Sequence, residues 1–112
     1  MSEFNAVLGD NELQEGAMRA VEVDGVPVLV SRSEDGEVCT IANICAHRGG
    51  PLNEGERDGD VVTYPWHGSQ FDLCSGEVLR GPAREPQQRF EARVREGKIE
   101  VRSLLQPVRR ET

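Results

Sequence analysis

The residue types best able to bind a metal are concentrated in two short segments of this chain. The chain has only two histidines and three cysteines. Cys45 and His47 stand in the segment CAHRGGPL at 45–52, and His67 stands in PWHGS at 65–69. Thiolate and imidazole bind transition metals, and glycines let a loop turn tightly enough to direct backbone N–H groups at an anionic centre. The two segments therefore predict a metal cluster held by loops.

Short strands separated by turns must position these loops. No segment sustains the apolar spacing of a helix, whereas β-rich runs recur between turn dipeptides such as Asp24-Gly25 and Glu96-Gly97. Pro27 places its strand at a sheet edge or at a strand start. The sequence predicts an all-β fold, an antiparallel sandwich or small barrel. The expected strands are 17–23, 26–31, 38–44, 61–64, 70–73, 77–79, 90–95 and 98–102, with 48–59 as a glycine-bearing insertion.

Length and charge narrow the function classes. The 112 residues are enough for one domain, which we expect to span the whole chain. Thirteen basic residues against 20 acidic ones give a net charge of -7, which disfavours nucleic-acid binding and suits a partner with a basic docking patch. No basic segment followed by an apolar run opens the chain, and no run of 18 apolar residues occurs. We expect a soluble protein of the cytoplasm, without a membrane partner.

The odd number of cysteines indicates free thiols or metal ligands rather than a disulfide framework. Cys39 lies six residues before Cys45, and Cys74 lies seven residues after His67. Along extended strands these separations put the two sulfurs about 20 Å and about 10 Å from the loops. We expect both side chains to be buried as small hydrophobes.

The order and spacing of these segments resemble the Rieske iron–sulfur family, whose motif is Cys-x-His, about sixteen residues, then Cys-x-x-His. Cys45-Ala46-His47 matches the first half, and after sixteen residues Tyr64-Pro65-Trp66-His67 matches the second half except at its first position. The likeness covers nearly the whole domain. The residues that flank the two halves also match the family: Ile44, Arg48-Gly49-Gly50-Pro51-Leu52, Phe71-Asp72 and Ser75-Gly76. Gly81-Pro82-Ala83 resembles the family's proline loop.

The resemblance divides the domain and assigns the ligands of a [2Fe–2S] cluster. It implies cluster-binding loops at about 44–52 and 63–71 and a proline loop at about 80–84. The tail at 103–112 is polar after Leu105, so we expect it to fray. His47 and His67 would bind the outer iron and Cys45 the inner one, with Tyr64 at the second thiolate's position. A phenolate oxygen lies about 4 Å further from Cα than a cysteine sulfur. Tyr64 is therefore a weak substitute ligand.

The same resemblance implies a one-electron carrier with no enzymatic activity of its own. Ser69 stands where high-potential relatives supply a hydroxyl, but Phe71 replaces their tyrosine, and Gly50 and Trp66 replace their disulfide cysteines. These differences favour the low-potential, soluble ferredoxin type. Such ferredoxins carry electrons from a flavin reductase to a terminal non-haem iron oxygenase. Acidic residues of the insertion, Glu54, Glu56, Asp58 and Asp60, form either a solvated surface or a rim that meets a basic reductase.

Two other functions stay open because of Tyr64. In its missing ligand the chain resembles the small subunit of NADH-dependent nitrite reductase, which has the Rieske fold without a cluster. By this resemblance the chain would be a binding subunit of a larger oxidoreductase. One cysteine and two histidines with an open position also suit a mononuclear zinc or iron site built from Cys45, His47 and His67. One nucleotide change converts a cysteine codon into a tyrosine codon. The sequence is therefore compatible both with a natural Tyr64 and with an engineered variant of an ordinary Rieske protein.

Overall fold

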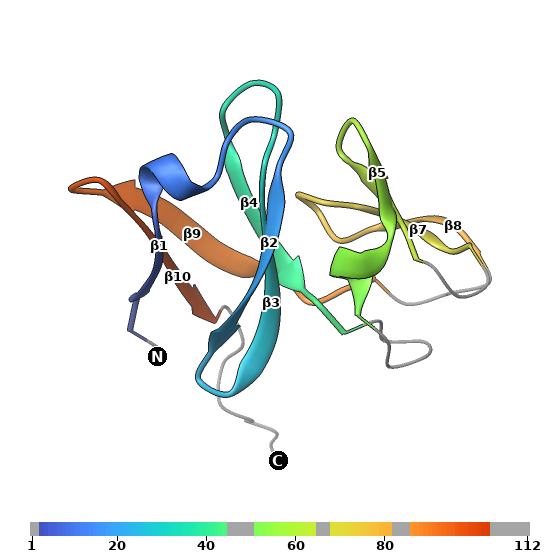
Figure 1. Ribbon diagram of the computed structural model, residues 1–112. Helices are drawn as coiled ribbons and strands as arrows, with labels where there is room; N and C mark the ends of the chain where they lie inside the picture. The colour runs from blue at the N-terminus through green and yellow to red at the C-terminus, as the bar shows by residue number, and fades with distance from the viewer. Residues whose placement is uncertain (1–2, 45–50, 65–67, 82–85, 104–112) are drawn as a thin grey trace, which may run out of the picture.

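Three small antiparallel sheets make up the part of the chain that the structure describes. This structure is a computed structural model, and it describes residues 3–44, 51–64, 68–81 and 86–103. Figure 1 shows one three-stranded sheet at the middle, with a second three-stranded sheet on one side and a four-stranded sheet on the other. The two 3₁₀ turns, η1 (Asp10–Glu12) and η2 (Leu52–Glu54), are the only helical elements among the described residues. The predicted all-β fold is confirmed.

The base sheet has the strand order β1-β10-β9. Its strands are β1 (Asn5–Gly9), β9 (Phe90–Arg95) and β10 (Lys98–Ser103). The predicted hairpin at Glu96-Gly97 is confirmed, and both residues have positive φ values, 54° and 79°. Two successive positive φ values match the right-handed twist of the flanking strands. The pairing of β1 with β10 brings the first strand of the chain beside the last.

The middle sheet has the strand order β2-β3-β4. Its strands are β2 (Met18–Val23), β3 (Val26–Arg32) and β4 (Val38–Ala42). Although β3 is the central strand, Pro27 lies at its start, one of the two positions predicted for it. The carbonyl oxygen of Pro27 accepts a 3.0 Å hydrogen bond from the backbone N–H of Asn43.

The third sheet has the strand order β5-β6-β7-β8 and carries the second histidine-bearing loop. Its strands are β5 (Glu56–Asp58), β6 (Val61–Thr63), β7 (Gln70–Asp72) and β8 (Val78–Arg80). The strand β5 and the turn η2 both lie in the stretch that the sequence indicated only as an insertion. The three residues of β5 are Glu, Arg and Asp. The strand therefore lacks the alternation of apolar and polar residues by which a strand is predicted from sequence.

The middle sheet is packed on both faces, which divides the core in two. Val28 and Val30 face the base sheet, whereas Leu29 faces the third sheet, because successive strand residues point to opposite faces. The base cluster consists of Leu13, Val23, Val28, Val30, Phe90, Ile99 and Val101. The loop-side cluster consists of Leu29, Ile41, Leu52, Val62, Tyr64, Phe71 and Leu73. Burial of both faces explains the continuous apolar run of β3.

A disulfide between Cys39 and Cys74 joins the middle sheet to the third sheet. The expectation of two free, separately buried thiols is therefore wrong. The chain does not continue outward after Gln70, because β7 ends at Asp72, whose Oδ1 accepts 2.8 Å hydrogen bonds from the N–H groups of Cys74 and Ser75. This turn brings the two Cα atoms of the cysteines to 4.8 Å, within the distance that a disulfide spans.

Arg57 of β5 also connects the third sheet to the middle sheet. Its Nη1 donates to the carbonyl oxygen of Ala17 at 2.7 Å, and its Nη2 donates to the carbonyl oxygen of Arg32 at 2.9 Å. Its Nε donates to the carbonyl oxygen of Gly59 at 2.7 Å. Only 8% of the side chain is exposed. The buried guanidinium therefore supplies two charge-assisted hydrogen bonds across the junction of the two sheets and a third within the turn between β5 and β6.

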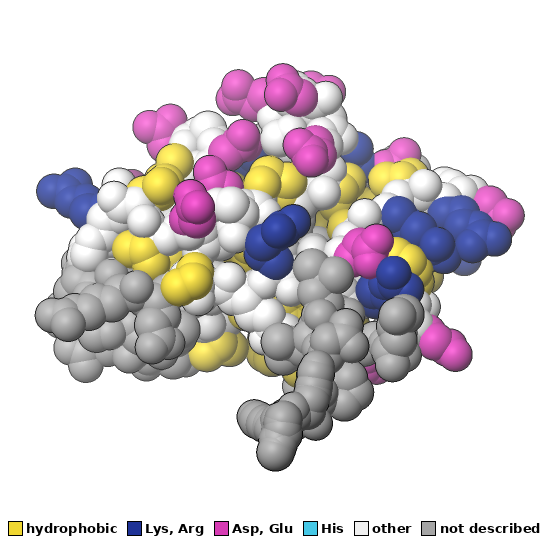
Figure 2. Space-filling model, turned by 180° about the vertical axis from the view of Figure 1, so that it is seen from behind, with side chains coloured by type: hydrophobic (Ala, Val, Ile, Leu, Met, Phe, Trp, Pro, Cys, Tyr) yellow, Lys and Arg dark blue, Asp and Glu magenta, His cyan; other side chains and the backbone are white. Residues whose placement is uncertain are grey.

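The net negative charge is unevenly spread over the surface. In Figure 2 acidic side chains line the upper edge, over the turns that follow β1 and β3, and Lys and Arg side chains gather at the end formed by the base sheet. The upper edge is thus a candidate surface for a basic partner. Among the described residues there is no helix long and apolar enough to cross a membrane.

Candidate metal centre

The described residues define the bases of the two histidine-bearing loops. The first loop leaves the end of β4, and a β-bridge between Ile44 and Pro51 brings its two ends together. Asn43 reinforces this closure: its carbonyl oxygen accepts from the N–H of Leu52 at 2.6 Å, and its Oδ1 accepts from the N–H of Asn53 at 2.9 Å. Its Nδ2 donates to Oδ1 of Asn53 at 2.9 Å. The start and end of the loop are therefore fixed to each other.

Gln87 fixes the same loop base from the segment that precedes β9. Its buried side chain donates from Nε2 to the carbonyl oxygens of Ala42 and Ile44, at 2.9 and 2.8 Å. Its backbone N–H donates to the carbonyl oxygen of Gly76 in the turn between β7 and β8. Gln87 therefore connects its own segment to the end of β4 and to the turn between β7 and β8.

The second loop is shorter, and a backbone hydrogen bond joins its two ends. The N–H of Tyr64 donates to the carbonyl oxygen of Ser69 at 2.7 Å, directly beyond the β6–β7 pairing of Thr63 with Gln70. Gly68 has a φ of +76°, a conformation that glycine adopts without steric cost. The loop carrying His67 is thus a tight connection between two paired strands.

The two loop bases meet at the loop-side cluster. Leu52 is the last residue of the first segment and is fully buried, and Tyr64 directly precedes the segment 65–69 and is 1% exposed. Both belong to the same cluster as Phe71 of β7. Packing therefore brings the bases of the two loops into one apolar cluster.

Of the predicted ligands, only Tyr64 lies among the described residues. Cys45, His47 and His67 lie outside them, as do Gly50, Trp66, most of the proline loop and the 104–112 tail. Tyr64 shares the orientation of Val62, two residues earlier, so its ring packs in the loop-side cluster. Ser69 is also fully buried.

The donor types fit a [2Fe–2S] cluster at three positions of four. The sequence supplies two imidazoles for one iron and one thiolate for the other. The fourth position holds a ring surrounded by aliphatic and aromatic side chains, where an ionised phenolate would lose the stabilisation of water. The sequence therefore offers both of the predicted imidazole ligands and one of the two predicted thiolates.

A second group of metal-binding residue types occurs among the described residues. Ligand atoms of Glu37, Cys39 and Cys74 lie within 4.8 Å of one another. Because the two sulfurs are bonded to each other, they offer no thiolate to a metal ion.

Two kinds of supporting residue were not recognised from the sequence. Asn43 and Gln87 are buried polar side chains that hold the loop bases. The position of Asn43, directly after an apolar strand and before Ile44, was a usable signal. Cys39 and Cys74 were also compatible with a disulfide, because they are the two cysteines that remain once Cys45 is assigned to the motif.

Comparison with known proteins agrees with this geometry. The family model Rieske [2Fe-2S] domain matches residues 3–100. The chain is 35% identical to Ferredoxin CarAc of Metapseudomonas resinovorans, with 85% of this chain and 89% of that protein covered. It is 31% identical to Apoptosis-inducing factor 3 of Homo sapiens over 90% of this chain, but it spans only 16% of that protein.

A solved structure shows the same fold. In the complex of reduced oxygenase and oxidized ferredoxin in carbazole 1,9a-dioxygenase, one chain superposes with a TM-score of 0.82 at 33% identity. The match covers 88% of this chain and 92% of that one. By its sequence, its sheets and its paired loops, this chain belongs to the Rieske [2Fe-2S] domain family.

Proposed function

We propose that the protein is a one-electron carrier of the Rieske ferredoxin type. The observation that carries this proposal is the near full-length match to Ferredoxin CarAc, which covers 85% of this chain and 89% of that protein. A match of this kind leaves little of either chain outside the shared domain. In this proposal the chain acts as the carrier, and the catalytic step belongs to a partner enzyme.

The ligands in this proposal are His47 and His67 on one iron and Cys45 on the other, with Tyr64 at the fourth position. When bound, the cluster accepts and releases one electron. The chain's own contribution is to fix the bases of the loops. Asn43 and Gln87 fix the base of the first loop, while the apolar side chains of the loop-side cluster exclude water from the loop bases. A rigid, dry support reduces reorganisation when the charge changes.

The partners we propose are a flavin reductase as donor and a terminal non-haem iron oxygenase as acceptor, in the cytoplasm. The relative in the solved complex is described as a ferredoxin with its oxygenase. The acidic upper edge supports association with a basic partner surface, since complementary charge raises association rates.

Iron and acid-labile sulfide content, with an ultraviolet–visible spectrum, tests this function on protein purified anaerobically. Two irons and two sulfides per chain, bleached by one electron and restored by an oxygenase, are the expected result. Colourless protein without sulfide would contradict it.

The buried ring of Tyr64 favours a second candidate, a member that no longer carries the cluster and acts as a binding subunit. A tyrosine packed in the core supplies no thiolate to the inner iron. This function requires metal-free protein that co-purifies with a larger oxidoreductase. One metal per chain without sulfide would instead identify the mononuclear site of Cys45, His47 and His67, and His67→Ala should then abolish metal binding.

A further inference from the structure

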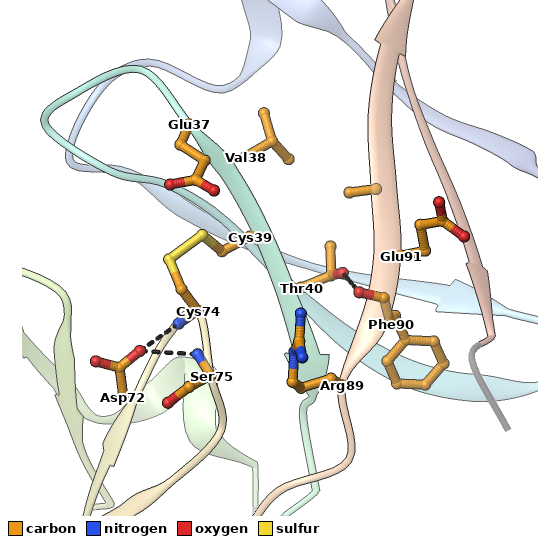
Figure 3. A pocket seen from close by; sticks show the side chains of 11 residues that line it. Glu37, Val38, Cys39, Thr40, Asp72, Cys74, Ser75, Arg89, Phe90 and Glu91 are labelled. Atoms are coloured by element: carbon orange, nitrogen blue, oxygen red, sulfur yellow. Dashed lines mark hydrogen bonds between the residues drawn. A yellow bond between two sulfur atoms is a disulfide. The ribbon is translucent and has the colours of Figure 1, made fainter.

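A groove on the described surface has the Cys39–Cys74 disulfide in its wall. The groove has a volume of about 660 Å³ and lies between β4, the β7–β8 turn and the start of β9. Figure 3 shows the disulfide between Glu37 on one side and Asp72 on the other, with Arg89 and Glu91 across the groove. Cys39 is 6% exposed, and Cys74 is half-buried. Cys74 is therefore the more exposed residue of the two.

The disulfide connects the two parts of the fold that carry the loops. Cys39 belongs to β4, which leads into the first loop, and Cys74 follows β7, which returns from the second loop. The cysteines are 35 residues apart in sequence. The bond thus ties together the supports of both loops from the side of the groove.

We propose that Cys39 and Cys74 form a reversible thiol–disulfide site, which a protein dithiol reductant opens from this groove. Disulfides that are accessible from the surface are the ones that exchange, because an attacking thiolate must approach along the S–S axis. The proposal concerns a second redox site, separate from the proposed electron-carrying centre.

The exchange is balanced in atoms and electrons. One thiolate of the reductant attacks Sγ of Cys74, the S–S bond breaks, and Sγ of Cys39 leaves as a thiolate. The second thiolate of the reductant then attacks the mixed disulfide and releases Cys74. Two electrons pass to the protein, the reductant becomes a disulfide, and the two cysteine sulfurs take up two protons from water.

Reduction changes the turn after β7 while the sheets stay paired. Hydrogen bonds from Leu73 N–H to the Asp60 carbonyl and from Gln87 N–H to the Gly76 carbonyl hold the turn without the disulfide. The N–H groups of Cys74 and Ser75 depend on Asp72 Oδ1 alone among the described bonds. Their hydrogen exchange should therefore accelerate on reduction, by tenfold or more, while exchange in the β9–β10 hairpin stays unchanged.

The test uses the full chain in native buffer with dithiothreitol as the probe. After minutes of exposure the thiols are trapped with iodoacetamide and located by mass spectrometry, and hydrogen exchange is followed in a parallel sample. The expected result is that Cys39 and Cys74 are labelled together, and only after dithiothreitol. Labelling without reductant would show that no disulfide exists, and labelling only in denaturant would show that it is inaccessible; either result overturns the proposal.

A double variant, Cys39→Ser with Cys74→Ser, provides the matched control. Its hydrogen exchange should not respond to dithiothreitol, since Cys45 is its only remaining cysteine. An equal response in the variant would assign the effect to Cys45 and contradict the proposal. Because labelling of the native chain needs no variant, the test does not depend on the variant's folding, and iron content plays no part in it.

Discussion

The backbone N–H of Tyr64 donates to the carbonyl oxygen of Ser69 at 2.7 Å, and this bond closes the second loop while the ring of Tyr64 packs in the core. Tyr64, at the fourth ligand position, therefore has a structural role: its backbone joins the ends of the second loop and its ring fills part of the core. Replacing the ring and replacing the hydroxyl should have different effects.

We expect Tyr64→Phe to retain the metal content of the native protein, because the ring stays in the loop-side cluster. Loss of the hydroxyl should lower the free energy of unfolding by at most about 1.5 kcal/mol. Iron analysis and urea unfolding measure the two effects. A fall in iron content would show that the phenol oxygen is a ligand.

Tyr64→Cys should raise the iron and sulfide content by restoring the second thiolate, and should cost about 2–4 kcal/mol of stability through the cavity left by the ring. Anaerobic reconstitution followed by electron paramagnetic resonance of the reduced protein measures the gain. An unchanged cluster content would mean that the loops have diverged beyond repair by one ligand.

Asn43→Ala should loosen the first loop, because the side chain no longer bonds Asn53. We expect a loss of about 1–2 kcal/mol in unfolding free energy and faster hydrogen exchange at the Asn53 N–H. Asn11→Ala, at an exposed asparagine of η1, is the matched control. Equal exchange rates at Asn53 in native protein and Asn43→Ala would argue against a role for Asn43 in closing the loop.

Arg57→Ala should weaken the junction of the middle and third sheets. Its carbonyl partners on Ala17 and Arg32 each keep a backbone donor, the N–H of Arg32 and of Gly16 respectively. The expected loss is therefore moderate, about 2–4 kcal/mol by urea unfolding. Arg19→Ala, at an exposed arginine with one long hydrogen bond, should change stability by less than about 0.5 kcal/mol. Similar losses in both variants would contradict the special role of Arg57.

Gly55→Ala should be poorly tolerated because of steric contact rather than backbone conformation. A Cβ at Gly55 would lie 2.0 Å from the carbonyl oxygen of Thr63, so β5 and β6 would have to separate. We expect a loss of about 3 kcal/mol. In Gly59→Ala the added Cβ meets open space and only the positive φ of 62° is strained, which costs about 1–2 kcal/mol. The difference between their urea midpoints is the measurement, and equal midpoints would exclude the steric explanation.

The sequence by itself determined the features that depend on neighbouring residues. The Asp24-Gly25 and Glu96-Gly97 hairpins were predictable because their positive φ values are a local property of those residues. The all-β class followed from short apolar runs, and the spacing of Cys45, His47 and His67 predicted two ligand-bearing loops. These signals needed no knowledge of which strands pair.

Only the tertiary structure decided the contacts between distant segments. The Cys39–Cys74 disulfide was wrongly excluded, because the turn at Asp72 and the approach of β4 depend on packing rather than on composition. The strand β5 was not predicted, because it has no apolar face. It is held by pairing with β6 and by the hydrogen bond from Arg57 to the carbonyl oxygen of Ala17. Burial of Tyr64 likewise results from two sheets closing over it, a property that no single residue carries.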